Sequence, residues 1–355
     1  MSTQSQKSMP YVRLGKSGLK VSKIILGCMS YGTPAWESWV LPEEDGIAHI
    51  KAAYDAGINT FDTANVYSNG GSEIVLGKAI KQHSLPRHEI VVMTKVFFTV
   101  ARGGGAGFGT TPAGLDAAGY ANQRGLSRKH IFESVKHSLE RLQLEYVDVL
   151  QCHRFDNETP IEETMQALHD VVQAGHARYI GMSSCWAWQF HAMQNYAIAH
   201  NLTPFISMQN HYSLAYREEE REMMPTLKAN SAQHFGVGSM PWSPLARGLL
   251  TRPLGAQAAT KRGAVDRIIH RYTQFDGDKE IVNRVEALAK QKNASMAQVA
   301  LAWVMQKDGV TAPIVGTTSL ENLRDLVGAV HLELSAEEVK SLEEMYQPRA
   351  TNGHT

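Results

Sequence analysis

The chain has 355 residues, of which 43% are hydrophobic and 20% are charged, a composition typical of a globular protein with a large core. Thirty-five basic residues balance thirty-five acidic ones, and no run of lysine or arginine marks a site for nucleic acid or for an anionic membrane. The length allows one large domain or two ordinary ones.

Three cysteines, Cys28, Cys152 and Cys185, lie far apart in the sequence and form no CxxC pair. This pattern argues against a disulfide framework or a structural metal site and fits a reducing compartment. Residues 1–10 are polar and lack an apolar secretory segment, and no stretch approaches the ~18 consecutive apolar residues of a membrane span. We therefore predict a cytoplasmic protein that binds neither nucleic acid nor membrane.

The first predicted elements form a hairpin. Residues 11–14 and 21–26 flank the turn-rich spacer 15–18, and the second run is also consistent with a buried strand. A helix is predicted over residues 42–56, because apolar residues recur there at helical spacing and Gly57 follows.

Strands and helices then alternate along the chain. The predicted strands cover residues 59–61, 89–94, 147–150, 177–181, 205–208, 237–240 and 312–315. The predicted helices cover residues 72–81, 127–142, 160–174, 188–200, 217–229, 279–292, 295–307, 319–329 and 335–345. A looser stretch covers 244–277, and residues 331–334 are strand-like.

About eight strand–helix units follow one another without a composition break that would mark a linker. Such alternation predicts a parallel sheet, and eight units close into a (β/α)8 TIM barrel. A doubly wound open sheet is the rival, but the first predicted strand lacks a Gly-rich phosphate turn at residues 27–30. We predict a single barrel domain over residues 11–346, with an N-terminal hairpin, extra helices and loose tails at 1–10 and 347–355.

The most informative stretch is 59–68, where a short strand ends at Asp62 and Tyr67 follows on the loop. Lys95 and His153 follow the next two strands, so all four side chains are expected at the C-terminal rim of the barrel. A phenol has a pKa of ~10, which a nearby ammonium lowers. With Asp62 as the counter-charge of Lys95 and His153 bonded to a carbonyl oxygen, the set predicts a general acid that protonates an alkoxide.

Each residue also has a structural interpretation. Asp62 could cap a turn, and a single Tyr or Lys at a strand end is usually structural or solvated. His153 could satisfy a core hydrogen bond while Arg154 pairs with Asp156. The appearance of all four at successive strand ends favours catalysis.

Residues 61–68 (Phe-Asp-Thr-Ala-Asn-Val-Tyr-Ser), the pair Thr94-Lys95 and the triplet Cys152-His153-Arg154 resemble the tetrad motifs of the aldo-keto reductase family. The resemblance extends over almost the whole chain, and its detail is similar to the branch of aryl-alcohol dehydrogenase-like enzymes. It implies that Tyr67 is the general acid and base and that the other three residues support it.

The resemblance also implies a nicotinamide dinucleotide, NADP(H) rather than NAD(H), lying extended across the rim. Residues implied near the carboxamide and the nicotinamide ring are Ser183, Ser184, Gln209 and Trp242. Residues implied along the pyrophosphate and at the adenosine end are Ser243, Leu245, Gly248, Gly316, Thr318 and Asn322. Backbone amides and the start of the helix after Gly316 are a reasonable anion site.

Two departures from the family pattern stand out. Ser184 replaces an asparagine that many relatives carry, and residues 316–319 lack a Lys or Arg for the 2′-phosphate, which leaves Arg324 as the nearest candidate. The insert 102–125 is rich in glycine but contains no GxGxxG and is predicted to be a flexible lid or a disordered loop.

Three other side chains lie beside these motifs. Trp186 is predicted to wall the substrate pocket and Trp188 to lie in the core, and Cys152 is predicted to be a packed small residue.

The leading functional hypothesis is reversible NADPH-dependent reduction of a small aldehyde or ketone to an alcohol. Potassium-channel β subunits share this fold, so an interaction or redox-sensing protein with slow reductase activity is an alternative, and a non-redox barrel enzyme such as an isomerase is a third. Fold alone does not choose between them, whereas the tetrad favours the reductase. Tryptophans in the loop 29–40 suggest aryl or bulky apolar carbonyls, and the sequence leaves the oligomeric state open.

Overall fold

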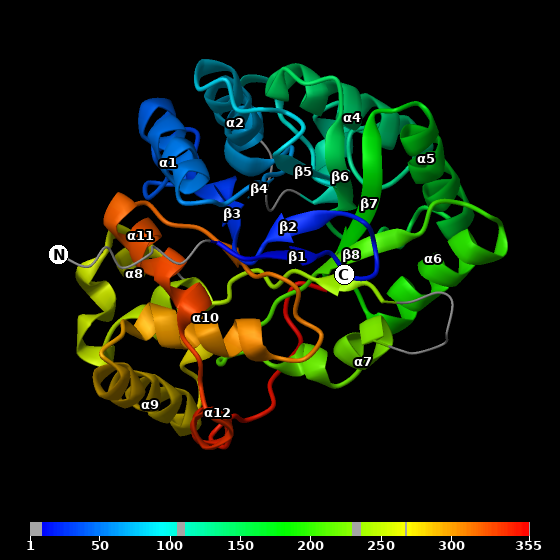
Figure 1. Ribbon diagram of the computed structural model, residues 1–355. Coiled ribbons are helices and arrows are strands. Elements are labelled where there is room, and N and C mark those ends of the chain that lie inside the picture. The colour runs from blue at the N-terminus through cyan, green and yellow to red at the C-terminus, as the bar shows by residue number, and fades with distance from the viewer. Residues whose placement is uncertain (1–8, 105–110, 229–235, 267, 355) are drawn as a thin grey trace.

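The computed structural model describes residues 9–104, 111–228, 236–266 and 268–354 (Figure 1). Over these residues, eight strands form one parallel sheet in the order β10-β3-β4-β5-β6-β7-β8-β9. The backbone nitrogens of Thr311 and Ile314 donate to the oxygens of Ser239 (2.9 Å) and Pro241 (2.8 Å), which joins the two edges of the sheet. The predicted (β/α)8 barrel is confirmed.

The barrel strands are short and almost entirely buried. They are β3 (Ile25–Gly27), β4 (Thr60–Asp62), β5 (Val91–Val96), β6 (Val147–Cys152), β7 (Ala177–Ser183), β8 (Phe205–Gln209), β9 (Gly238–Ser239) and β10 (Ile314–Val315). Every residue of β5 and β6 is buried, as expected for strands with the barrel interior on one face and helices on the other.

Helices surround the sheet (Figure 1). They are α1 (Glu43–Asp55), α2 (Gly71–Gln82), α3 (Pro112–Ala117), α4 (Arg128–Leu142), α5 (Ile161–Gln173), α6 (Ala187–Ala199), α7 (Met223–Lys228), α8 (Lys261–Val265), α9 (Asp276–Lys292), α10 (Met296–Gln306), α11 (Leu320–Gly328) and α12 (Ala336–Glu343). The hydroxyl of Ser127 caps α4 by accepting from the amide of His130, and the apolar face predicted for this helix is buried. Within the described ranges, no helix combines the length and the apolar character needed to cross a membrane.

The predicted hairpin is present as β1 (Tyr11–Arg13) and β2 (Lys20–Ser22), which pair antiparallel. Leu14 and Val21 pack in one apolar cluster with Ile25, Val91 and Val149, residues from the beginnings or middles of barrel strands. The hairpin therefore lies across the N-terminal end of the barrel (Figure 1) and leaves the opposite end for a site.

Two predicted elements differ in the described structure. The helix predicted over 217–229 is a 3-10 turn at Glu218–Glu220 followed by the short α7, because these glutamates bind partners elsewhere and tertiary contacts override local propensity. The strand-like segment 331–334 forms no strand, since the backbone amide of Leu334 bonds to the side chain of Gln306 at 3.1 Å.

The C-terminal segment, residues 347–354, was predicted to be loose but packs against the rim. The side chain of Arg349 pairs with Asp278, and its backbone nitrogen donates to Glu218 at 2.8 Å. The backbone nitrogen of Asn352 donates to the hydroxyl of Tyr216 at 2.9 Å. Of the predicted N-terminal tail, Met9 is buried and residues 1–8 lie outside the described part.

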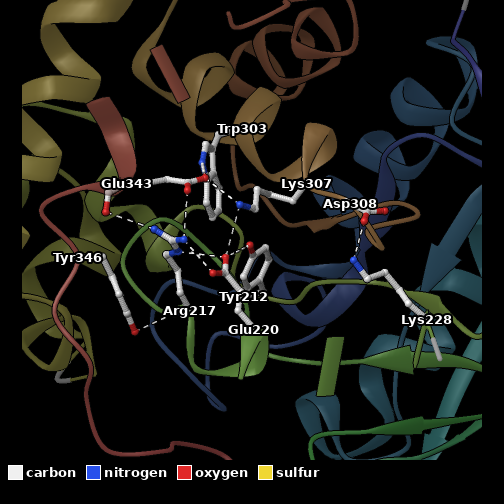
Figure 2. Close-up of polar contacts among 9 residues, drawn as sticks. All are labelled: Tyr212, Arg217, Glu220, Lys228, Trp303, Lys307, Asp308, Glu343 and Tyr346. Carbon is white, nitrogen blue, oxygen red and sulfur yellow. Dashed lines mark hydrogen bonds and ion pairs between the residues drawn. The ribbon is translucent and has the colours of Figure 1, made fainter. Parts of the chain in front are cut away.

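A network of charged side chains fixes the end of α12 beside the loop that follows β8 (Figure 2). Arg217 bonds to Glu220 at 2.8 Å and to Glu343 at 3.2 Å. Glu343 also accepts from Lys307 (2.9 Å) and from the indole nitrogen of Trp303 (2.8 Å). Because these charges are paired, their partial burial is tolerated, and the network sets the point from which the C-terminal segment starts.

The glycine-rich insert is ordered where it is described. Residues 105–110 lie outside the described part, but α3 follows, and Ala101, Leu115 and Tyr120 form a small apolar cluster. The hydroxyl of Tyr120 accepts from the backbone nitrogen of Arg102 at 2.8 Å. The prediction of a disordered loop is therefore wrong for residues 111–125.

Candidate active site

The ends of two neighbouring strands bring an ion pair together beside a phenol. Asp62 is the last residue of β4, and Lys95 lies near the end of β5. The Nζ of Lys95 is 2.6 Å from Oδ2 of Asp62, 2.8 Å from the backbone oxygen of Thr63 and 3.4 Å from the hydroxyl of Tyr67. Lys95 is fully buried, so these oxygens replace its water.

Asp62 is held on both of its oxygens. Its second oxygen, Oδ1, accepts from the side-chain amides of Gln151 (2.9 Å) and Gln209 (3.0 Å). Burial disfavours the charge of Lys95, but the carboxylate of Asp62 and the hydroxyl of Tyr67 together outweigh burial, and the pKa of Lys95 is raised above its usual 10.5. Asp62 is therefore the counter-charge that the sequence predicts and does not serve as a turn cap.

Tyr67 lies on the loop after β4, next to Ser68 and Asn69, whose φ values are 49° and 52°. Its ring lies 6.4 Å from that of Trp36 and 5.6 Å from that of His153, which it meets edge-on. Burial raises the pKa of Tyr67 above 10.0, and the charge of Lys95 offsets this only in part. Lys95 lowers the pKa of this phenol, as the sequence predicts, but burial outweighs that effect, so the phenol is protonated at neutral pH.

His153 follows β6 and is buried, with its backbone nitrogen bonded to the oxygen of Val96 at 2.9 Å. Its ring meets that of Phe98 edge-on at 5.0 Å. Burial, followed by the charges of Arg154 and Lys95, lowers the pKa of His153 well below 6.5. The imidazole is therefore neutral and can share a hydrogen bond with a carbonyl oxygen.

A cavity of about 1500 Å³ opens above these side chains and is lined by Asp62, Tyr67 and His153. Among the predicted cofactor residues, all but Ser184 line it: Ser183, Gln209, Trp242, Ser243, Leu245, Gly248, Gly316, Thr318 and Asn322. The hydroxyl of Ser184 instead accepts a hydrogen bond from the indole nitrogen of Trp242 at 3.0 Å. One cavity thus joins the tetrad to the residues predicted for the dinucleotide.

The chain matches the family model described as the aldo/keto reductase family over residues 23–347. It belongs to the aldo/keto reductase family. Enzymes of this family act on carbonyl groups of small molecules and generally use NAD(P)H, and this chain is an oxidoreductase of that kind.

Fungal proteins are similar to this aldo/keto reductase over nearly their whole length. Versiconal hemiacetal acetate reductase of Aspergillus parasiticus is 47% identical over 344 residues, 96% of this chain and 98% of that protein. A Schizosaccharomyces pombe protein provisionally named an aryl-alcohol dehydrogenase is 51% identical over 350 residues, 97% of each chain. An aldo-keto reductase of Fusarium vanettenii is 46% identical over 357 residues, 99% of this chain and 95% of that protein. The predicted resemblance to the aryl-alcohol dehydrogenase-like branch is confirmed.

The loop after β9 carries backbone conformations that the sequence did not predict. Ser243, Ala246 and Arg247 have φ values of 52°, 47° and 57°, and Gly248 follows at 106°. Non-glycine residues adopt this left-handed region at an energetic cost, and several such residues in one loop are a feature found at binding sites. In this reductase the strained loop borders the cavity between Trp242 and the basic residues beyond it.

Four basic residues from the stretch 244–277 also line the cavity and were not predicted from the sequence. Arg247 and Arg262 both bind Asp266, at 2.7 Å and 3.0 Å. Arg252 and Lys261 line the cavity without a carboxylate partner in the part of the chain that the structure describes. The doublet Lys261-Arg262 is the sequence signal from which two of these basic residues could have been found.

The proposed phosphate ligand Arg324 does not belong to the cavity. It is exposed on α11 and is not among the lining residues. Arg252 and Lys261 line the cavity, whereas Arg324 does not.

The walls of the reductase cavity only partly match the prediction. Met29, Trp36 and Trp39 line it, as do Asn352 and Gly353 of the C-terminal segment. These last two were missed because residues 347–355 were predicted to be a loose tail.

The two tryptophans before and at the start of α6 lie differently from the prediction. Trp186 does not line the cavity; it is 43% exposed, and its ring lies 4.8 Å from that of His354. Trp188 was predicted to be core but is 62% exposed. Cys152 is buried, as predicted, and burial raises its pKa, so its thiol is unreactive there.

Proposed function

We propose that the protein catalyses the reversible NADP(H)-dependent reduction of an aldehyde or ketone to an alcohol, with Tyr67 as the proton donor. The observation that carries the proposal is the position of Lys95 between Asp62 and the hydroxyl of Tyr67, at the bottom of a large cavity. The 47% identity to a reductase supports it.

The cavity fits a dinucleotide. Its volume of about 1500 Å³ exceeds the ~300–1,000 Å³ of a pocket for one drug-sized molecule, so cofactor and substrate have room together. Trp242 lines the same cavity as Tyr67 and offers it an aromatic side chain, and Arg252 and Lys261 offer positive charge for phosphate groups. When bound, the cofactor supplies the hydride that the carbonyl carbon accepts.

The chain's own residues handle the proton. The Tyr67 hydroxyl is protonated at neutral pH and gives its proton to the oxygen of the reacting carbonyl as negative charge develops there. Lys95 stabilises the phenolate that remains, and Asp62 keeps Lys95 charged. The neutral imidazole of His153 orients the carbonyl oxygen by a hydrogen bond.

Substitution of Tyr67 by phenylalanine tests this assignment. The variant keeps the ring and loses the proton donor, so turnover should fall by roughly 10²–10⁴-fold while cofactor affinity stays within about twofold. NADPH oxidation with an aldehyde panel measures the first quantity, and quenching of tryptophan fluorescence measures the second. Tyr54→Phe, on the outer helix α1, is the matched control. Undiminished turnover in Tyr67→Phe removes this residue from the mechanism.

We also propose a cytoplasmic location. Cys28, Cys152 and Cys185 are all free and buried in the structure, as suits a chain folded in a reducing compartment. Fractionation of the native cells with an antibody to the protein tests this.

A further inference from the structure

Arg154 is a charged residue of the site that the mechanism above does not use. It follows His153 directly after β6, is half-buried and lines the same cavity as Tyr67. Its Nη1 donates to the backbone oxygen of His153 at 2.5 Å, the one hydrogen bond that its guanidinium makes within the described chain. Because a guanidinium carries five N–H donors, most of its capacity is left for another group.

The acidic residues near Arg154 are engaged elsewhere. Asp156 accepts from the backbone nitrogen of Leu126 and from the hydroxyl of Thr159, both at 2.7 Å. The Arg154–Asp156 ion pair that the sequence allowed is therefore not formed. Glu219 lies 3.4 Å from the ring of His354. Across the residues that the structure describes, no carboxylate pairs with Arg154.

The tetrad end of the cavity consequently carries an excess positive charge. The ion pair beneath Tyr67 is internally balanced, and His153 is neutral. Burial lowers the pKa of His211 and of His354, and the charge of Arg154 lowers both further. The guanidinium of Arg154 lines the same cavity as the phenol of Tyr67. A charge that is partly removed from water is stabilised when an opposite charge binds it.

We propose that Arg154 binds an anionic group of the substrate, so that the preferred substrates are aldehydes or ketones that carry a carboxylate. This inference rests on the proposed carbonyl reduction, because it assigns the substrate class of the same site. Arginine and carboxylate match in geometry and form paired, charge-assisted hydrogen bonds. Met29 and Trp36 line the same cavity and offer an apolar surface to the body of such a substrate.

The three isomers of carboxybenzaldehyde, each compared with its methyl ester, test the inference, because the isomers place the carboxylate at different distances from the carbonyl. For the best isomer, we expect kcat/KM of the wild type to be about 10- to 100-fold higher for the acid than for the ester. Arg154→Met should remove most of this difference in kcat/KM by raising the KM for the acid, and it should change kcat/KM for the ester by less than about threefold. Arg154→Lys should keep part of the difference between acid and ester. Arg128→Met, which breaks an exposed ion pair with Asp170 on the outer helices, is the control.

A second measurement does not depend on turnover. Calorimetric titration of the protein with benzoate should give a Kd about 10-fold higher for Arg154→Met than for the wild type, at unchanged circular dichroism and cofactor affinity. Three results would overturn the role of Arg154. In the first, Arg154→Met loses acid and ester reduction equally; in the second, it binds the cofactor more weakly; in the third, it binds benzoate as tightly as the wild type does. If esters are reduced but acids gain nothing, this inference alone fails. If no carbonyl compound is reduced, the proposed function fails, and the benzoate titration still decides on Arg154.

Discussion

The indole of Trp242 lies flat on the imidazole of His211, with ring centroids 4.1 Å apart and planes 11° apart. Tyr216 covers the other face of His211 at 3.9 Å, which makes a stack of three rings. The Nε2 of His211 lies 2.7 Å from the hydroxyl of Tyr272, a residue of the stretch that covers the cavity. The position of Trp242 beside the cavity therefore depends on a buried histidine that does not line it.

Substitution of His211 by leucine should weaken cofactor binding. It removes the ring stack, worth ~0.5–1.5 kcal/mol, and leaves the Tyr272 hydroxyl without a partner. We expect the Kd for NADPH to rise about three- to tenfold, with a changed emission of Trp242. Fluorescence titration measures both. His137→Leu on the outer helix α4 is the control, and a wild-type Kd in His211→Leu shows that the stack does not place Trp242.

The pH profile of reduction follows from two pKa shifts. Reduction needs a protonated phenol, and because the pKa of Tyr67 is raised above 10.0, activity is lost only as the pH rises beyond that value. The pKa of His153 is lowered well below 6.5, so its protonation does not reduce the activity near pH 6.5. We expect kcat to be flat between about pH 6.5 and 9. A pH–kcat series at saturating substrate measures this, and an inflection near 6.5 would mean that His153 titrates in the working enzyme.

Lys261 is predicted to discriminate NADP(H) from NAD(H). A charge-assisted bond to the 2′-phosphate is worth ~1.5–3 kcal/mol, so Lys261→Met should raise KM for NADPH about 10- to 100-fold and leave KM for NADH nearly unchanged. Arg252→Met tests the second cation in the same way. Steady-state kinetics with both cofactors measure the effect, with the exposed Lys129→Met as control. Parallel changes for NADPH and NADH would place these charges at the pyrophosphate instead.

The barrel and the tetrad were predictable from sequence because their signals are local. A strand that ends at Asp62 and a loop that carries Tyr67 lie within eight residues, and parallel strands in register bring Lys95 beside them. The alternation of apolar strand and helix segments predicts the order of the strands. That order predicts which residues lie at the C-terminal rim of the barrel. The positions of the four side chains then follow from topology alone.

The remaining features depend on contacts between distant segments. The raised pKa of Tyr67 reflects its burial, which no motif encodes and which outweighs the charge of Lys95. Trp188 looked like a core residue on a helix, but it lies on the exposed side of the first turn of α6. The C-terminal segment 347–354 is polar and short, and only its contacts with Asp278, Glu218 and Tyr216 show that it packs against the barrel.

Two C-terminal truncations should separate the stability of the fold from the shape of the cavity. Deletion of residues 350–355 keeps the buried pair of Arg349 and Asp278 but removes Asn352 and Gly353 from the cavity wall. Deletion of residues 348–355 also removes Arg349 and leaves the charge of Asp278 buried without its partner, at a cost of ~3–5 kcal/mol. We expect the first deletion to raise the KM for aldehydes at a nearly unchanged Tm, and the second to lower the Tm as well. Thermal unfolding and steady-state kinetics of both variants measure these effects, with deletion of residue 355 alone as the control. If the shorter deletion leaves every KM unchanged, the C-terminal segment closes no part of the substrate site and serves stability alone.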